Sequence, residues 1–158
     1  MKGLLILFLI ALGLNATAQS SSDIALKNKT TKISWKDLKI DSMSDAWSDE
    51  FNAYYAVVHF SSEVEKMNGK VVEIIGFYYP IDIVDGYYLL TEDKDIGFGC
   101  VLGGNTIRPD NAMEIKLSEC HAKYGDRIKV MGTLVLNKDD LYQLSYIIKD
   151  AKYELVDK

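Results

Sequence analysis

One pattern of apolar and polar positions occurs twice along the chain. Residues 69–76 and residues 125–132 each begin with a glycine, carry apolar side chains at alternate positions and end with a second glycine. Such alternation is typical of a strand with one buried face, and a glycine inside a strand marks a bulge or a sharp bend. The pattern therefore predicts two long strands, over residues 71–79 and 127–136, each bent at its second glycine.

The rest of the chain predicts further, shorter strands. Their signal is an alternating or aromatic-rich apolar segment bounded by turn residues. Such segments lie at residues 33–38, 54–60, 87–91, 112–117 and 141–148, and residues 151–156 continue the last one after a kink at Lys149 and Asp150.

One short helix is expected just before the first long strand. Ser61 can cap its N-terminus, and Gly69 ends it. Val64 and Met67 are spaced to form its buried side. The preceding segment, residues 41–52, is mostly polar and is expected to form a loop or one helical turn.

These elements predict a mainly β fold, a small five-to-six-stranded OB-like barrel with one short helix. The OB (oligonucleotide/oligosaccharide-binding) barrel is a five-stranded Greek-key architecture. A β-sandwich would need more evenly spaced strands. We expect a single domain over residues 33–158, in which residues 33–60 form an N-terminal extension packed on a barrel built from residues 61–156.

The N-terminus predicts export. Lys2 precedes an apolar run, residues 4–14, and small residues at positions 16 and 18 fit a signal-peptidase site. Residues 1–18 are therefore expected to be a cleaved signal peptide, and residues 19–32 a flexible leader. The apolar run is shorter than the roughly 20 residues that cross a bilayer, and no cysteine lies near the cleavage point. We expect no integral membrane span and no lipid anchor, and a periplasmic or secreted location.

The charge of the chain limits the classes of partner that it can be expected to bind. It carries 23 acidic and 18 basic residues, a net charge of −5, with no basic run. Nucleic-acid binding depends on neutralising phosphates with lysine and arginine. We therefore expect no nucleic-acid partner, and instead a protein, peptide or sugar ligand that the sequence does not identify.

Four segments resemble a family of uncharacterised exported proteins of Gram-negative bacteria that carry an OB-like domain. They are residues 35–38, with a Trp-x-x-Leu run, residues 67–77, with a Gly-Lys-x-Val-x-Ile-x-Gly-Phe run, and residues 125–134 and 144–151. The resemblance implies a periplasmic OB-like protein of unknown function. That family tends to show a Cys-x-x-Cys-Gly motif near its middle. Here Cys100 is followed by Gly103 where the second cysteine would stand, so the motif is incomplete.

Cys100 and Cys120 are the only cysteines, and three interpretations of them stay open. An even number in an exported chain favours one disulfide. Two free thiols are the second interpretation. The third is a transition-metal site, such as zinc, on Cys100, Cys120 and His121, with Glu119 or His59 as a further ligand. Zinc sites usually contain two closely spaced ligand pairs, which this chain lacks. Apart from this alternative, no cofactor is expected.

Tyrosine is frequent, with ten in the chain, and six of them form adjacent pairs. Neighbouring residues in a strand face opposite sides, so each pair places one ring inside and one outside. The candidate ligand-binding residues are Tyr78, Tyr79, Tyr87 and Tyr88, on an aromatic barrel face, and Asn105 in the glycine-rich loop. OB barrels bind ligands on such faces by stacking. The alternative explanation is ordinary strand propensity.

No catalytic motif is present. The chain has no Gly-x-Ser-x-Gly, no His-Glu-x-x-His and no phosphate-binding loop. We expect a soluble exported binding or accessory module that is not an enzyme and contacts a peptide, sugar or protein partner through the aromatic face. The alternative is a metal-binding or thiol-redox periplasmic protein that uses Cys100, Cys120 and His121.

Overall fold

The computed structural model describes residues 30–97 and 105–156 of the 158-residue chain. The predicted signal peptide, residues 1–18, and most of the predicted leader lie outside the described residues, as does Cys100. The described part is mainly β, with one short α-helix and one 3-10 helix. It contains no helix that is both long and apolar enough to cross a membrane.

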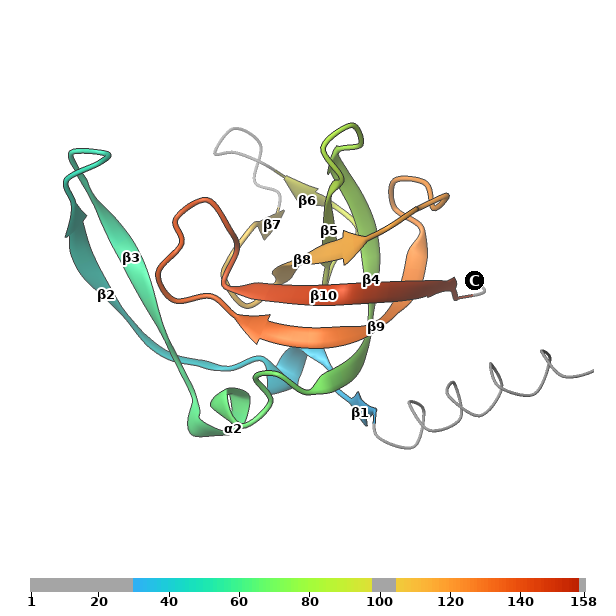
Figure 1. The fold of residues 1–158 in the computed structure, drawn as a ribbon, viewed down its shortest axis with the longest axis horizontal. Helices are drawn as coiled ribbons and strands as arrows, with labels where there is room; N and C mark the ends of the chain where they lie inside the picture. The colour runs from blue at the N-terminus through green and yellow to red at the C-terminus, as the bar shows by residue number, and fades with distance from the viewer. Residues whose placement is uncertain (1–29, 98–104, 157–158) are drawn as a thin grey trace, which may run out of the picture. The chain divides into compact units, whose positions relative to one another are not determined.

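Five strands form a closed barrel (Figure 1). They are β4 (Val71–Asp82), β5 (Tyr87–Thr91), β8 (Ala112–Leu117), β9 (Arg127–Leu136) and β10 (Tyr146–Leu155). Around the barrel they follow the order β4-β5-β8-β10-β9, and β9 pairs back with β4. Neighbours are antiparallel except for the parallel pair β8 and β10. This is the Greek-key arrangement of an OB barrel, and the predicted fold class is confirmed.

Strand β4 closes the barrel by pairing on both of its edges. Residues 71–77 pair with β9, and residues 77–82 pair with β5. Gly76 lies where the strand changes partner. A Cβ atom at this position would stand 2.7 Å from the carbonyl oxygen of Thr91 and 2.7 Å from Cγ of Leu90. Only glycine therefore allows the neighbouring backbone to approach this closely.

A second glycine lies opposite an irregularity in β10. The register between β9 and β10 shifts between Lys149 and Lys152, and Asp150 has a positive φ of 52°. The kink predicted at residues 149–150 is therefore present, inside one strand that begins at Tyr146. A Cβ atom at Gly132 would stand 2.5 Å from Cγ2 of Ile148 and 2.6 Å from the carbonyl oxygen of Lys149.

The barrel interior is filled by alternate residues of its strands, and the short helix α2 (Ser62–Glu65) adds to this core. Ser61 caps α2, since its Oγ accepts a hydrogen bond from the backbone N of Val64 at 3.3 Å. Val64 is fully buried, and Met67 packs against the core. Gly69 follows with a φ of 76°. The helix predicted from the capping pattern is thus confirmed.

The segment that precedes α2 is partly different from the prediction. Strand β1 (Thr31–Lys32) pairs in parallel with the start of β4, but the strand expected at residues 33–38 is a 3-10 helix, η1 (Trp35–Asp37). The backbone N and Oγ of Ser34 both donate to Oδ2 of Asp37, at 2.8 and 2.7 Å. These local bonds compete with strand pairing and fold the chain into a turn.

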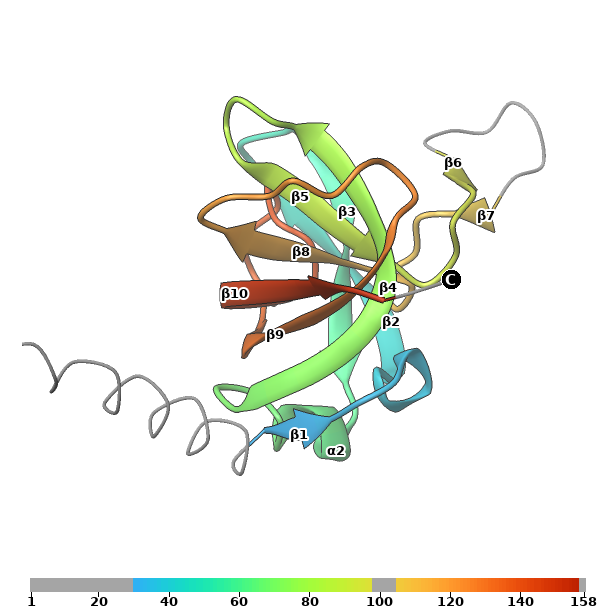
Figure 2. The same cartoon turned by 90° about the vertical axis from the view of Figure 1, so that its right-hand side faces the viewer.

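Strands β2 (Ile40–Ser48) and β3 (Ala53–Phe60) form a hairpin with a sheet of its own. Figures 1 and 2 show it extending beside the barrel from the region of α2. Only Val58 and Phe60 are buried along its strands. The prediction of a loop or helical turn at residues 41–52 is therefore wrong, because most of this segment belongs to strand β2. Because both faces of β2 meet solvent, its sequence lacks the apolar alternation that signals a strand.

Two short strands complete the described elements. They are β6 (Ile96–Gly97) and β7 (Asn105–Thr106), which pair with each other in parallel. They flank residues 98–104, which lie outside the described chain.

Replacing Gly132 by alanine tests the close approach of β9 and β10. Because the added methyl group overlaps Ile148 and the backbone of Lys149, we expect the free energy of unfolding to fall by about 1–3 kcal/mol. Urea unfolding followed by circular dichroism measures this. The control is Lys149→Ala, an exposed change in the facing strand, which should alter stability by less than about 0.5 kcal/mol. Equal losses in both variants would contradict the prediction.

Candidate ligand-binding surface

The four tyrosines predicted to bind a ligand divide into an inner and an outer pair. Tyr78 and Tyr88 are 3% and 8% exposed, and their ring centroids lie 5.7 Å apart inside the core. Tyr79 and Tyr87 are half-buried on the outside, as the alternation of the strands requires. Burial, followed by a hydrogen bond to Cys120, raises the pKa of Tyr78. The inner pair is therefore part of the core and is not accessible to a ligand.

The two rings of the outer pair have different contacts. The ring of Tyr79 contacts the ring of Tyr124 at 4.9 Å, whereas Nζ of Lys116 lies 5.5 Å from the ring centre of Tyr87. In the β4–β5 register Tyr79 faces Leu89, and Tyr87 faces Asp82. The two outer rings thus have different neighbours, and their contact with a ligand stays a prediction.

The residues of the alternative metal site are only partly described. Cys120 is half-buried and is the only cysteine among the described residues. Cys100 lies outside the described residues, so a disulfide between them stays a prediction. His121 is exposed, and its backbone N donates to the hydroxyl of Tyr153 at 2.8 Å. In the described part of the chain, no three His, Cys, Asp or Glu side chains lie close enough to hold a metal ion.

Two further candidates from the sequence lie away from any described site. His59 faces Ser44 across the hairpin, with 2.8 Å between its Nε2 and the serine Oγ. Asn105 begins β7, next to the residues that the structure does not describe. The role predicted for Asn105 stays a prediction.

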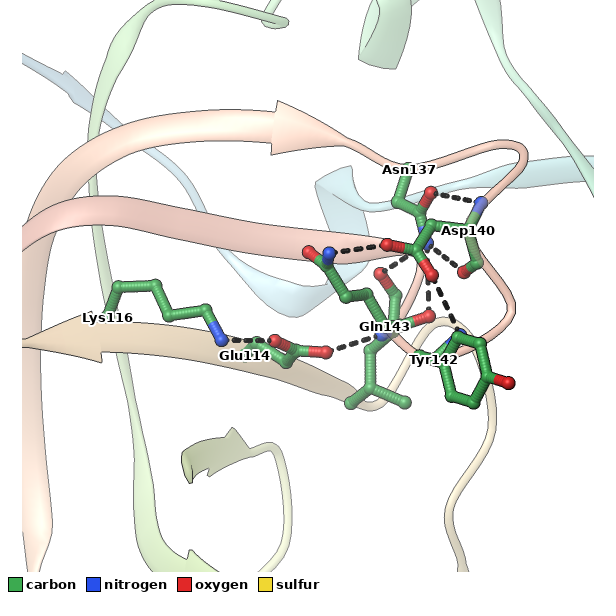
Figure 3. A network of polar contacts seen from close by, with 7 residues as sticks. Glu114, Lys116, Asn137, Asp140, Tyr142 and Gln143 are labelled. Carbon is green, nitrogen blue, oxygen red and sulfur yellow. Dashed lines mark hydrogen bonds and ion pairs between the residues drawn. The ribbon is translucent and has the colours of Figure 1, made fainter. Parts of the chain in front are cut away.

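The outer face of β5 and β8, where OB barrels usually bind ligands, lies against the chain's own β9–β10 loop. Glu114 of β8 and its neighbour Leu89 of β5 are 0% and 1% exposed. The Glu114 carboxylate accepts a hydrogen bond from the backbone N of Leu144 at 2.7 Å and pairs with Nζ of Lys116 at 2.8 Å (Figure 3). Burial of Tyr87, followed by the negative charge of Glu114, raises the pKa of that tyrosine.

The β9–β10 loop, residues 137–145, is held by two polar side chains (Figure 3). Nδ2 of Asn137 donates to the carbonyl oxygens of Asp140, Gln143 and Leu144, at 2.7, 3.0 and 3.3 Å. The Asp140 carboxylate accepts from the backbone N of Tyr142 at 2.9 Å and from Nε2 of Gln143 at 2.6 Å. The loop is therefore a fixed platform, from which the Tyr142 side chain projects with 70% of its surface exposed.

An open hollow of about 300 Å³ lies between this loop and the tip of the β2–β3 hairpin. Its lining residues are Trp47, Ser48, Glu50, Tyr55, Asp139, Asp140, Leu141 and Tyr142. Two contacts connect the β9–β10 loop to the hairpin tip. The hydroxyl of Tyr142 donates to Oε1 of Glu50 at 2.8 Å, and the rings of Phe51 and Tyr142 lie 5.5 Å apart. We call this region the hairpin–loop hollow.

Large apolar side chains are exposed on the hairpin that forms one wall of the hairpin–loop hollow. Trp47 and Tyr54 face each other across the hairpin, with ring centres 5.1 Å apart, and they are 48% and 73% exposed. Met43 and Phe51 are exposed on the same hairpin. Gathered exposed apolar groups bordered by polar residues mark interaction sites on folded proteins.

The hairpin–loop hollow is also acidic. Glu50 lines it from the hairpin, and residues 40–60 as a whole contain four carboxylates, at positions 41, 45, 49 and 50, and no lysine or arginine. Asp139 and Asp140 add two more from the loop. The neighbouring Lys138 pairs with Glu65 at 2.7 Å. The hydrogen bond to Glu50 is the main cause of a raised pKa of Tyr142.

This surface was not found from the sequence, although one signal was present. Trp47 and Phe51 are large apolar residues in an otherwise polar, acidic segment. Such residues outside any apolar pattern are candidates for contact with a partner. Their relation to Tyr142, which lies more than 90 residues away in sequence, depends on the fold.

Comparison with known proteins identifies the fold and not the activity. The chain is similar in structure to a DUF3299 family protein from Pseudomonas aeruginosa PAO1, with a TM-score of 0.51 and 11% sequence identity. The similarity covers 82% of this chain and 99% of that protein. No protein-family model and no curated protein matches the sequence. At this identity, the likeness supports a common fold alone.

Replacing Glu114 tests how the loop is anchored. In Glu114→Ala, the backbone N–H of Leu144 loses its acceptor, so we expect a loss of about 1–3 kcal/mol in unfolding free energy. Glu114→Gln keeps an acceptor oxygen and should lose less. Urea unfolding measures stability, and amide hydrogen exchange at Leu144 reports the local bond. If that amide stays equally protected in Glu114→Ala, the anchoring role is wrong.

Proposed function

We propose that this protein is an exported binding module that contacts a peptide or protein partner through the hairpin–loop hollow and does not catalyse a reaction. The observation that carries the proposal is the set of exposed aromatic side chains on two ordered segments. Trp47 and Tyr142 keep 48% and 70% of their surface exposed on opposite walls. Aromatic residues held in this way are typical anchors of interfaces.

The form of the hairpin favours a peptide or protein over a sugar. Strands β2 and β3 pair only with each other among the described strands, so each has a free edge. An extended segment can add to such an edge through main-chain hydrogen bonds while its side chains occupy adjacent hollows. Met43 and Tyr54 expose further apolar surface on the same hairpin, 59% and 73% of each residue.

A displayed library of random peptides tests the proposed surface. We expect selected peptides to bind the wild-type protein and to lose at least about tenfold in affinity on Trp47→Ala, because the exposed ring is lost from the hollow. Tyr124→Ala is the matched control. It removes a similarly exposed aromatic ring, 54% exposed, from the β8–β9 loop on the other side of the barrel (Figure 1). Its affinity should stay within about twofold of the wild type.

Two results of the library experiment would overturn the proposal. One is that no peptide is enriched on the folded protein. The other is that the selected peptides bind Trp47→Ala as well as they bind the wild type. Circular dichroism of each variant is the control that tests whether the barrel is folded.

Export is part of the proposal and is tested separately. The full chain is expressed in a Gram-negative host, and its periplasmic fraction is analysed by intact mass spectrometry. Since residues 16–18 fit a signal-peptidase site, we expect a chain that begins at Gln19. A full-length product confined to the cytoplasm would contradict export.

A further inference from the structure

The hairpin–loop hollow combines aromatic rings with carboxylates. Its lining residues include the aromatic residues Trp47, Tyr55 and Tyr142 and the acidic residues Glu50, Asp139 and Asp140. A cation within about 6 Å of a ring centre is attracted by the negative face of the ring, and tryptophan is the strongest such partner. Carboxylates at the same place add charge-assisted hydrogen bonds.

The acidic groups of the hollow are not neutralised by the described chain. The hydrogen-bond donor to Glu50 is neutral, since it is the hydroxyl of Tyr142, at 2.8 Å, and the neighbouring Asp49 accepts from the indole N–H of Trp47 at 2.9 Å. Asp140 accepts from a backbone N–H and an amide. No ion pair between described residues includes a carboxylate of residues 40–60, or those of positions 139 and 140.

Lys138, which precedes Asp139 in the sequence, is already in an ion pair. Nζ of Lys138 lies 2.7 Å from Oε1 of Glu65, the last residue of helix α2. The net charge of residues 40–60 is −4, against −5 for the whole chain. The negative charge of the protein is therefore concentrated on the hairpin, and a cationic ligand is the electrostatic complement.

From this geometry we infer that the hairpin–loop hollow binds the ammonium or guanidinium group of a lysine or arginine side chain, carried by a basic peptide segment of the partner. The inference rests on the proposed binding function and adds the chemistry of the ligand. The volume of about 300 Å³ is at the lower end of small-ligand sites, which suits one or two side chains.

The fixed position of the walls favours selectivity. Asn137 and Asp140 hold the loop through the hydrogen bonds described above, and Glu50 ties Tyr142 to the hairpin. A ligand cation therefore meets rings and carboxylates that are already in place, and little conformational entropy is lost on binding. A neutral side chain of the same shape gains the apolar contacts but not the charge interaction.

The indole N–H signals in nuclear magnetic resonance spectra give a direct readout. The chain has two tryptophans, so two such signals are expected. Trp47 lines the hollow, whereas the indole of Trp35 donates to the carbonyl oxygen of Ile75 at 2.8 Å in the barrel. The Trp35 signal is therefore an internal control that should not move on titration.

The probes are short acetylated and amidated glycine peptides with one central residue. Arginine is compared with citrulline, and lysine with acetyl-lysine, because each pair differs mainly in charge. We expect the arginine and lysine peptides to shift the Trp47 signal and to bind at least about tenfold more tightly than their neutral counterparts. Raising the salt concentration from about 50 to about 500 mM should weaken their binding severalfold.

Two double variants distinguish the effect of charges in the hollow from the effect of the net charge of the protein. Glu50→Gln with Asp139→Asn removes two carboxylates from the hollow, while the amide introduced at position 50 keeps an oxygen for the hydroxyl of Tyr142. Asp85→Asn with Glu119→Gln removes the same charge from exposed positions elsewhere. We expect about tenfold weaker binding of the arginine peptide in the first variant and a change of less than about twofold in the second.

The outcomes distinguish this inference from the proposed function. If neutral peptides bind as tightly as charged ones, or if both double variants weaken binding equally, the cation site is wrong. If the random library yields peptides that depend on Trp47 but contain no lysine or arginine, the binding function stands and the cation site is overturned. If neither the library nor the basic peptides bind at Trp47, both are overturned.

Discussion

The structure depends on β4 being hydrogen-bonded along both edges. One strand pairs first with β9 and then with β5, and this change of partner closes the sheet on itself. A side chain at Gly76 would prevent the closure, because its Cβ would overlap Leu90 and the backbone of Thr91. Closure also removes the sheet edges that would otherwise be open to pairing with other chains.

Closure fixes the ends of the strands, and this in turn places the β9–β10 loop. Strands β9 and β10 are neighbours in the barrel, while β10 also lies beside β8. The buried carboxylate of Glu114 on β8 can therefore reach the backbone of Leu144 in the loop. As a result the loop lies against the face that OB barrels usually offer to ligands, and it presents Tyr142 toward the hairpin.

The hairpin contributes little to the core. Val58 and Phe60 anchor its base, while the tip is solvent-exposed on both faces. A two-stranded sheet is marginally stable alone, so its contacts with Tyr142 help to define the position of the tip. Exposed rings and carboxylates without an ion-pair partner in the described chain cost stability without adding to the core, which is consistent with a role in contact with a partner.

The sequence by itself determined the barrel. Residues 87–91, 112–117 and 127–136 were predicted with the bounds that the structure has, because their apolar residues alternate where one face is buried. The capped helix at Ser61 was predicted for the same local reason. The tertiary structure alone decided the location of the candidate site. The β2 strand carries no burial pattern, and the hollow joins Glu50 to a residue more than 90 positions away. The alternation of apolar and polar residues in a segment shows which face of a strand is buried. A contact between two exposed segments leaves no such pattern, because it depends on how the rest of the chain folds between them.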